Sequence, residues 1–187
     1  DSSHSAYGVF CLGTAVCQGY AYAYDYLLEH VGIEAEYCPS DALNHAWNIV
    51  YIGDKPYHVD VTSDDPVWDI SGRVNHTNFL RSTEGIKSVG NHKADDYTST
   101  PVDTTYDNAF WQNSTTAFQL VDNKIYYIDN EKQELNVIDD ITDTTPETIA
   151  ELDYRWTTAD GRYYNGNYSR LASIRDEIFY SAPTAVY

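Results

Sequence analysis

The chain has 187 residues, of which 42% are hydrophobic, and this is enough for a packed core in one domain or two small ones. Eleven Lys and Arg against 29 Asp and Glu give a net charge of −18, which argues against binding to nucleic acid or an anionic membrane and favours basic or neutral peptide substrates. No run of residues reaches the ~18 apolar positions of a membrane span, and Asp1-Ser2-Ser3 does not begin a signal peptide. We expect that any export signal lay outside this chain.

A turn of small residues leads into a predicted helix that carries the first candidate catalytic residue. Thr14 is a suitable N-cap, and apolar residues at helical spacing continue to Gly32, where the helix is expected to stop. Cys17 then falls in the first turn. There the backbone N–H groups and the helix dipole favour a thiolate and can receive an oxyanion. A lone cysteine at a helix start is more often a small buried residue, so the assignment depends on its partners.

Two strands joined by a tight turn are predicted next. Residues 45–52 and 55–62 read as strands, and Gly53 and Asp54 between them suit a two-residue hairpin turn. A turn of known length fixes which residues of the two strands face each other.

This register places the chemically active side chains on one face of the hairpin. His45 and Asp60 become diagonal neighbours at a separation that their side chains can close. Trp47 lies opposite Asp60, where it can shield the bond between them from water. His58 shares the face and is interpreted as a solvated strand histidine. A helix presenting Cys17 to the His45 face would complete a nucleophile, a base and an orienting acid.

The same segments resemble the transglutaminase-like superfamily, whose cores have the papain-like fold. The resemblance covers roughly residues 1–92 and is carried by residues 6–9, 15–21, 44–48 and 57–66. It implies an α+β core in which the nucleophile helix packs on an antiparallel sheet. Such cores usually have a helix or two before the nucleophile, and only sixteen residues precede it here, so we expect a fragment or a processed product.

By this resemblance Cys17 is the nucleophile, His45 is the general base and acid, and Asp60 orients the imidazole. Three further residues are candidates for contacting substrate or shielding the site: Gln18, Tyr20 and Trp47. The implied reaction is cysteine-dependent acyl transfer on peptide or glutamine-type amides through a thioester, without a metal or cofactor. Hydrolysis by a cysteine peptidase or amidase is preferred over transamidation, because bacterial relatives of this kind have this short spacing.

The alternative is a non-catalytic papain-like scaffold that binds protein or glycan. The presence of all three triad positions favours the enzyme. The expected partner is a protein or peptide substrate or a cell-surface polymer, and the expected location is extracellular or at the surface of a bacterial cell.

Four aspartates raise the question of calcium. Asp60, Asp64, Asp65 and Asp69 crowd one stretch, but their spacing lacks the Gly and the terminal Glu of a calcium loop. A solvated acidic loop with Pro66 setting its turn is the preferred interpretation.

The remaining cysteines are Cys11 and Cys38. They could pair in an oxidising compartment or stay as reduced, buried thiols, and the sequence leaves both alternatives open. No CxxC pair or His-Cys spacing indicates zinc.

The character of the chain changes after about residue 93. Residues 94–108 are rich in Asp, Thr, Ser and Tyr and read as a linker or a long loop. Short alternating strands follow at residues 117–121, 124–128 and 135–138. The pattern of residues 123–127 recurs weakly at 176–180, which is 53 residues later.

These features divide the chain in two. Residues 1–95 are predicted to form the catalytic core. Residues 96–187 are predicted to form a Tyr-rich, acidic appendage of antiparallel β structure, either a small domain or the first part of a truncated repeat domain. Its tyrosines could bind glycan or peptide, or simply belong to amphipathic strands.

Overall fold

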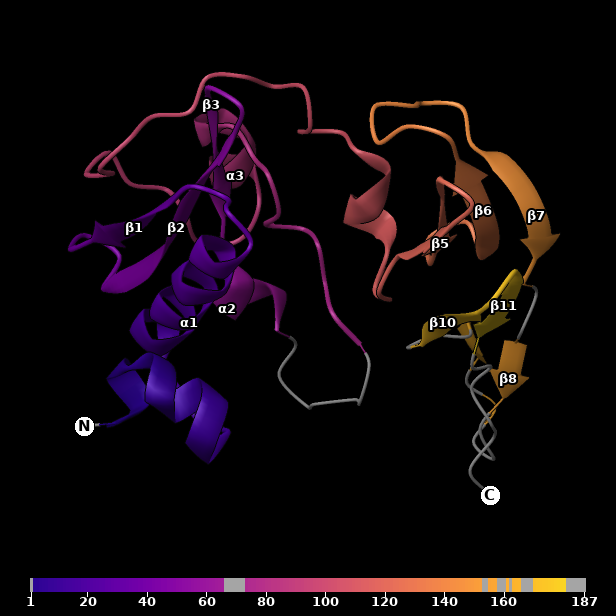
Figure 1. The fold of residues 1–187 in the computed structure, drawn as a ribbon, viewed down its shortest axis with the longest axis horizontal. Coiled ribbons are helices and arrows are strands. Elements are labelled where there is room, and N and C mark those ends of the chain that lie inside the picture. Colours follow the sequence, from indigo (N-terminus) through magenta and orange to yellow (C-terminus); the bar gives the residue numbers. More distant parts are fainter. Residues whose placement is uncertain are drawn as a thin grey trace. The chain divides into compact units, whose positions relative to one another are not determined.

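The fold is described from a computed structural model, which covers residues 2–65, 73–152, 155–157, 161, 163–165 and 170–180. These residues form an α+β structure in which every sheet is antiparallel, as predicted (Figure 1). They divide into two compact units. The first holds residues 2–65 and 77–108 and the second holds residues 73–76 and those from 109 onward, so the division differs from the predicted boundary at residue 95. Within this described part of the chain, no helix is long and apolar enough to cross a membrane.

The first unit combines short helices with one three-stranded sheet. Its elements are η1 (Ser2–His4), η2 (Gly8–Leu12), α1 (Cys17–His30), β1 (Ala35–Ser40), β2 (His45–Ile52), β3 (Lys55–Val59), α2 (Val61–Asp64) and α3 (Thr83–Ser88).

Helix α1 begins at Cys17, in agreement with the sequence pattern, and ends two residues before Gly32. Gly32 has a φ of 75°, a left-handed conformation that favours glycine and turns the chain out of the helix. The predicted position of Cys17 in the first turn is therefore confirmed.

The cap predicted for this helix is wrong. Its N-cap is Val16 rather than Thr14, and no side chain caps it. Instead the N-terminal segment packs on the helix start, where the backbone N–H of Val16 donates to the Ser3 carbonyl at 3.0 Å. Gly19 makes this approach possible, because a Cβ at that position would lie 2.5 Å from the same carbonyl oxygen.

The sheet has the order β1-β2-β3, with both neighbouring pairs antiparallel. The predicted hairpin register is confirmed from Ile52 opposite Lys55 to Asn48 opposite Val59. Strand β3 then ends one residue before Asp60, which leaves the sheet to cap α2. The observed register therefore stops at Val59 and does not include Asp60 itself.

Helix α1 covers the face of the sheet opposite to the predicted one. The rings of Tyr22 and Tyr37 stack at 4.9 Å, and the side-chain amide of Asn48 donates to the Ala21 carbonyl at 3.1 Å. Tyr37 and Asn48 are paired in the sheet and share this face. The expectation that the helix packs against the His45 face is therefore wrong.

The other face of the sheet has its own apolar cover. Its buried cluster consists of Cys38, Trp47 and Ile49, and Leu43, Tyr51 and Tyr97 pack against it. Tyr97 comes from the long segment after α3. That segment therefore helps to cover this face, while α1 covers the opposite one.

The segment predicted as a linker or long loop, residues 94–108, contains no helix or strand and belongs to the first unit. Hydrogen bonds along its length attach it to that unit. Asp96 accepts hydrogen bonds from Ser40 Oγ at 2.6 Å and the Ala42 backbone at 2.9 Å, and Asp107 accepts one from Ser82 Oγ at 2.6 Å. The loop is therefore part of the unit that contains the candidate site.

The second unit is mainly antiparallel β structure, as predicted for the appendage. Its elements are η3 (Phe110–Asn113), β4 (Gln119–Val121), β5 (Lys124–Asp129), β6 (Glu134–Ile138), β7 (Glu147–Glu151), β8 (Arg155–Thr157), β9 (Tyr163–Asn165), β10 (Leu171–Ile174) and β11 (Glu177–Tyr180). Strands β4 to β7 form one sheet in sequence order, and β8-β9 and β10-β11 form two-stranded sheets. Ile128, Leu135, Leu152 and Leu171 form a buried core cluster.

The weak sequence echo corresponds to two similar hairpins. Asp122 and Asn123 connect β4 to β5, and Arg175 begins the two-residue turn between β10 and β11. All three have a positive φ of 50° to 60°. Residues 123–127 and residues 176–180, which share the repeated pattern, thus each begin in a turn with positive φ values and continue into the second strand of a hairpin.

Candidate active site

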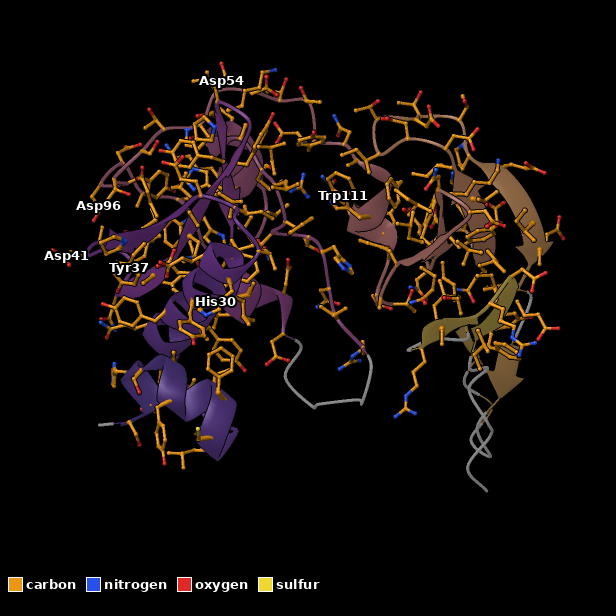
Figure 2. All side chains as sticks on the ribbon, viewed as in Figure 1. His30, Tyr37, Asp41, Asp54, Asp96 and Trp111 are labelled. Atoms are coloured by element: carbon orange, nitrogen blue, oxygen red, sulfur yellow. The ribbon has the colours of Figure 1, made fainter. Side chains whose placement is uncertain are left out.

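Cys17 and His45 line the same pocket in the first unit, at the start of α1 and the start of β2. The pocket has a volume of about 380 Å³. Gln18, Tyr37 and Asp41 also line it, and the last two are labelled in Figure 2. The start of α1, with Cys17, and the start of β2, with His45, therefore meet at this pocket.

His45 is bonded to Asp60, as the hairpin register predicts. Its Nε2 lies 2.7 Å from Asp60 Oδ2. The imidazole side chain is 21% exposed, whereas the carboxylate is completely buried. One end of the ring is thus fixed in the protein, and the ring still reaches solvent.

Asp60 accepts an unusually large number of hydrogen bonds. As the N-cap of α2, it uses Oδ1 to accept from the backbone N–H groups of Thr62 at 3.0 Å and Ser63 at 3.1 Å. Its Oδ2 accepts from His45 and from the Ser63 hydroxyl at 2.6 Å, and it also bonds His92 Nε2 at 2.7 Å. Burial alone raises the pKa of this carboxyl, but the bonds from His45 and His92 outweigh burial and hold the pKa well below its usual value.

His92 is the site residue that sequence reasoning missed. It lies in the long segment after α3, 32 residues beyond Asp60, and its side chain is 2% exposed. Its Nδ1 faces the Val89 carbonyl at 3.3 Å. No local pattern marks a histidine that a loop places in a site. Ser63 was also missed, although its place three residues after a capping aspartate is a recognisable helix-start pattern.

The reactive atoms of His45, Asp60 and His92 all lie within 4.8 Å of one another, which is close enough for a metal ion. Both imidazoles, however, bond the same carboxylate oxygen through Nε2. A metal ion held by these two nitrogens would replace both hydrogen bonds, because each Nε2 would have to give up its proton.

Trp47 forms a buried wall behind the two imidazoles. Its ring centre lies 5.5 Å from that of His45 and 5.3 Å from that of His92, and it has no solvent exposure. Its Nε1 donates to His58 Nδ1 at 2.9 Å. This position fits the predicted shielding role and places Trp47 out of reach of a bound substrate.

His58 is not the solvated strand histidine that the sequence suggested, because it is completely buried. Since its Nδ1 accepts from Trp47, its Nε2 carries the proton and donates to Thr83 Oγ1 at 3.1 Å. Burial lowers the pKa of His58 to about 3, and the nearby charges of His92 and Lys87 act in the same direction.

His58 is expected to make the protein acid-labile between pH 6.5 and 3. In that range His58 is protonated in the unfolded chain but not in the folded one. The free energy of unfolding therefore falls by about 1.4 kcal/mol for each pH unit as the pH drops. His58→Asn keeps an acceptor for Trp47 and should show a pH dependence of the unfolding free energy that is smaller by this amount. Urea denaturation between pH 4 and 7 measures it. The exposed His30→Asn is the control, and equal slopes for His58→Asn and the unmodified protein would contradict the prediction.

Of the other candidates, Gln18 is at the pocket and Tyr20 is not. The Gln18 side chain lies 3.1 Å from His4 Nδ1 and donates to the Tyr22 hydroxyl at 3.2 Å. The hydroxyl of Tyr20 donates to Asp65, just after α2. The contact of Tyr20 therefore ties α1 to the segment that follows Asp60.

The acidic stretch is only partly solvated. Asp65 is exposed, whereas Asp60 and Asp64 are both buried, and Asp64 accepts from the backbone and side chain of Asn78 at 3.0 and 2.9 Å. Burial raises the pKa of Asp64 to about 6. Two further positions in this prediction, Pro66 and Asp69, lie outside the described residues.

All three cysteines are free thiols in this structure. Cys11 is exposed, Cys38 is buried opposite Trp47 in the sheet, and Cys17 is intermediate. Burial raises the pKa of Cys38, which keeps it as an unreactive thiol.

Comparisons of the chain with family models, curated proteins and solved structures found no match.

Proposed function

We propose that the chain is a cysteine-dependent hydrolase of peptide or glutamine-type amides, with Cys17 as nucleophile, His45 as general base and acid, and Asp60 as the residue that orients His45. The observation that carries this proposal is that Cys17 and His45 line one pocket while His45 is bonded to a buried carboxylate. The resemblance of these segments to the transglutaminase-like superfamily, and with it a papain-like core, belongs to the same proposal.

The bond to Asp60 determines which nitrogen of His45 does the chemistry. Because Nε2 donates to the carboxylate, Nδ1 is the nitrogen for proton exchange with the thiol. A neutral His45 can take the Cys17 proton, and the resulting imidazolium is stabilised by Asp60. At the start of a 14-residue helix, the dipole of α1 stabilises the thiolate in turn.

In the proposed reaction the Cys17 sulfur attacks the amide carbonyl carbon, and the carbonyl oxygen takes up the negative charge. The first backbone N–H groups of α1 have no acceptor within the helix and point toward this end, so they suit the oxyanion. His45 then gives its proton to the leaving nitrogen as the C–N bond breaks, which leaves a thioester on Cys17. Water attacks the thioester, His45 takes the proton from water, and the acid product leaves as the thiol is restored.

Water is the proposed acceptor because the site is open to it. The His45 side chain remains 21% exposed, so water reaches the base that would activate it. Transamidation by an amine would use the same residues. Within the described part of the chain neither Lys nor Arg lines the pocket, whereas Asp41 does, which suits neutral or basic peptide substrates.

Selective alkylation tests the nucleophile without a known substrate. With iodoacetamide at pH 6.5, Cys17 is expected to react at least about tenfold faster than Cys11, because a helix N-terminus and a neighbouring histidine favour the thiolate. Cys11 is the more exposed thiol, so simple accessibility predicts the reverse order. Cys38 should react only after unfolding. Peptide mass mapping over time measures all three rates in one sample.

Cys17→Ala supplies the control, since the labelled peptide at this position should disappear while the other two rates stay the same. Equal rates for Cys17 and Cys11 across pH 5 to 8 would refute the assignment of Cys17 as an activated nucleophile.

A further inference from the structure

The carboxylate that orients His45 is shared with a second imidazole. Both His45 Nε2 and His92 Nε2 lie 2.7 Å from the same oxygen, Asp60 Oδ2. The two rings differ in their surroundings, because His45 lines the Cys17 pocket and is 21% exposed, whereas the side chain of His92 is 2% exposed. Asp60 therefore bonds one imidazole that is almost completely buried and one that is partly exposed.

The partners of His92 determine its protonation. One ring nitrogen faces a carboxylate oxygen of Asp60, and the other faces the Val89 carbonyl oxygen at 3.3 Å. Neither partner has a hydrogen to donate, so both nitrogens of His92 must donate for both contacts to be favourable. A ring that donates from both nitrogens is an imidazolium. The resulting positive charge is buried, and Asp60 supplies the negative charge that compensates it.

We propose that His92 is a positioning residue, an imidazolium clamped between Asp60 and Val89 that fixes the carboxylate used by His45 and offsets part of its negative charge. The kinetic consequence of this inference rests on the proposed function. With its charge partly offset, Asp60 still orients the His45 ring but stabilises a protonated His45 less strongly. His45 then gives its proton more readily to a leaving amine, as a general acid must.

Other charged and titratable groups also face His92 and Asp60. A substitution of His92 leaves all of these groups in place, so their effect on the cluster is the same in the variants as in the unmodified protein. Those that face it from the surrounding elements are His45, His58, Asp64, Lys87 and Tyr97.

The experiment is ¹⁵N NMR of the imidazole nitrogens in the intact chain, combined with Cys17 alkylation. At pH 7.5 His92 is expected to show two protonated ring nitrogens. His92→Gln keeps an N–H that can donate to Asp60 but removes the charge, so Asp60 should hold the His45 proton more tightly and the ¹⁵N signals of His45 at pH 7.5 should move toward those of a protonated ring. Cys17 alkylation at its optimum should stay within about threefold of the unmodified rate in His92→Gln and fall by about tenfold or more in His92→Phe, which donates nothing.

His76→Gln is the matched control, because the His76 ring contacts the Ser114 carbonyl at 3.0 Å in the second unit. It should leave both the His45 signals and the Cys17 rate unchanged. A singly protonated His92 ring at pH 7.5, or His45 signals that His92→Gln does not move, would overturn the proposal. The NMR outcome decides the role of His92 even if Cys17 proves unreactive, and that second result would count against the proposed function alone.

Discussion

Asp60→Asn is expected to lower the free energy of unfolding by about 3–5 kcal/mol at pH 7 and to abolish the enhanced reactivity proposed for Cys17. From the sequence alone, partial activity is expected, because an amide oxygen can still accept a bond from His45. The structure changes this expectation. Asp60 is completely buried and accepts two backbone bonds through Oδ1 and bonds from His45, His92 and Ser63 through Oδ2. An amide has one oxygen, so its NH₂ group must face donors on one side.

The pH dependence provides a second check on Asp60. Its folded-state pKa lies below the unfolded one, so its contribution to stability is complete above the unfolded pKa of about 3.9 and is lost as the pH falls further. The difference between the unmodified protein and Asp60→Asn should therefore be largest near neutral pH and shrink below about pH 4. Urea denaturation at several pH values measures this difference. Asp54→Asn, at an exposed position in the β2-β3 turn, is the control, and a loss below about 1 kcal/mol for Asp60→Asn would contradict the network described.

The parts of the fold that the sequence predicts correctly are decided by neighbours along the chain. The start of α1 at Cys17 and the hairpin register around Gly53 and Asp54 depend on short patterns and a turn of fixed length. The errors come from distant segments. The N-cap of α1 is Val16, held by the distant Ser3 carbonyl, instead of Thr14, and Tyr97 helps to cover the face on which the helix was expected.

The same distinction applies to the candidate site. The bond between His45 and Asp60 follows from the hairpin, so it can be predicted from two strands and a turn. His92 and the burial of His58 cannot, because both depend on segments whose path over the sheet has no local signature. The sequence thus predicts the contact between His45 and Asp60, while the other groups around Asp60 require the structure.

His45→Ala is expected to remove reactivity without removing the fold, in contrast to Asp60→Asn. The imidazole is partly exposed, and without it Asp60 keeps His92, Ser63 and its two backbone donors. The unfolding free energy should therefore change by no more than about 1 kcal/mol. Alkylation of Cys17 at pH 6.5 should fall by at least about tenfold, because a protonated histidine beside a thiol favours the thiolate. Turnover of an amide substrate should fall by about 10²- to 10⁴-fold with the loss of the proton donor.

His30→Ala is the matched control for this measurement. His30 is an exposed residue on the same helix, 13 positions after Cys17, and its ring lies against the ring and carbonyl of Tyr26 near the end of α1. At 1.5 Å per residue this is about 20 Å from the thiol, so the Cys17 rate should not change. If His45→Ala leaves the Cys17 rate unaltered while Asp60→Asn still destabilises the protein, Asp60 and its imidazoles form a structural network and the pocket is not a catalytic site. If the rate falls with the fold intact, the reactivity of Cys17 depends on His45 directly, since Asp60 and the helix dipole remain in place in that variant.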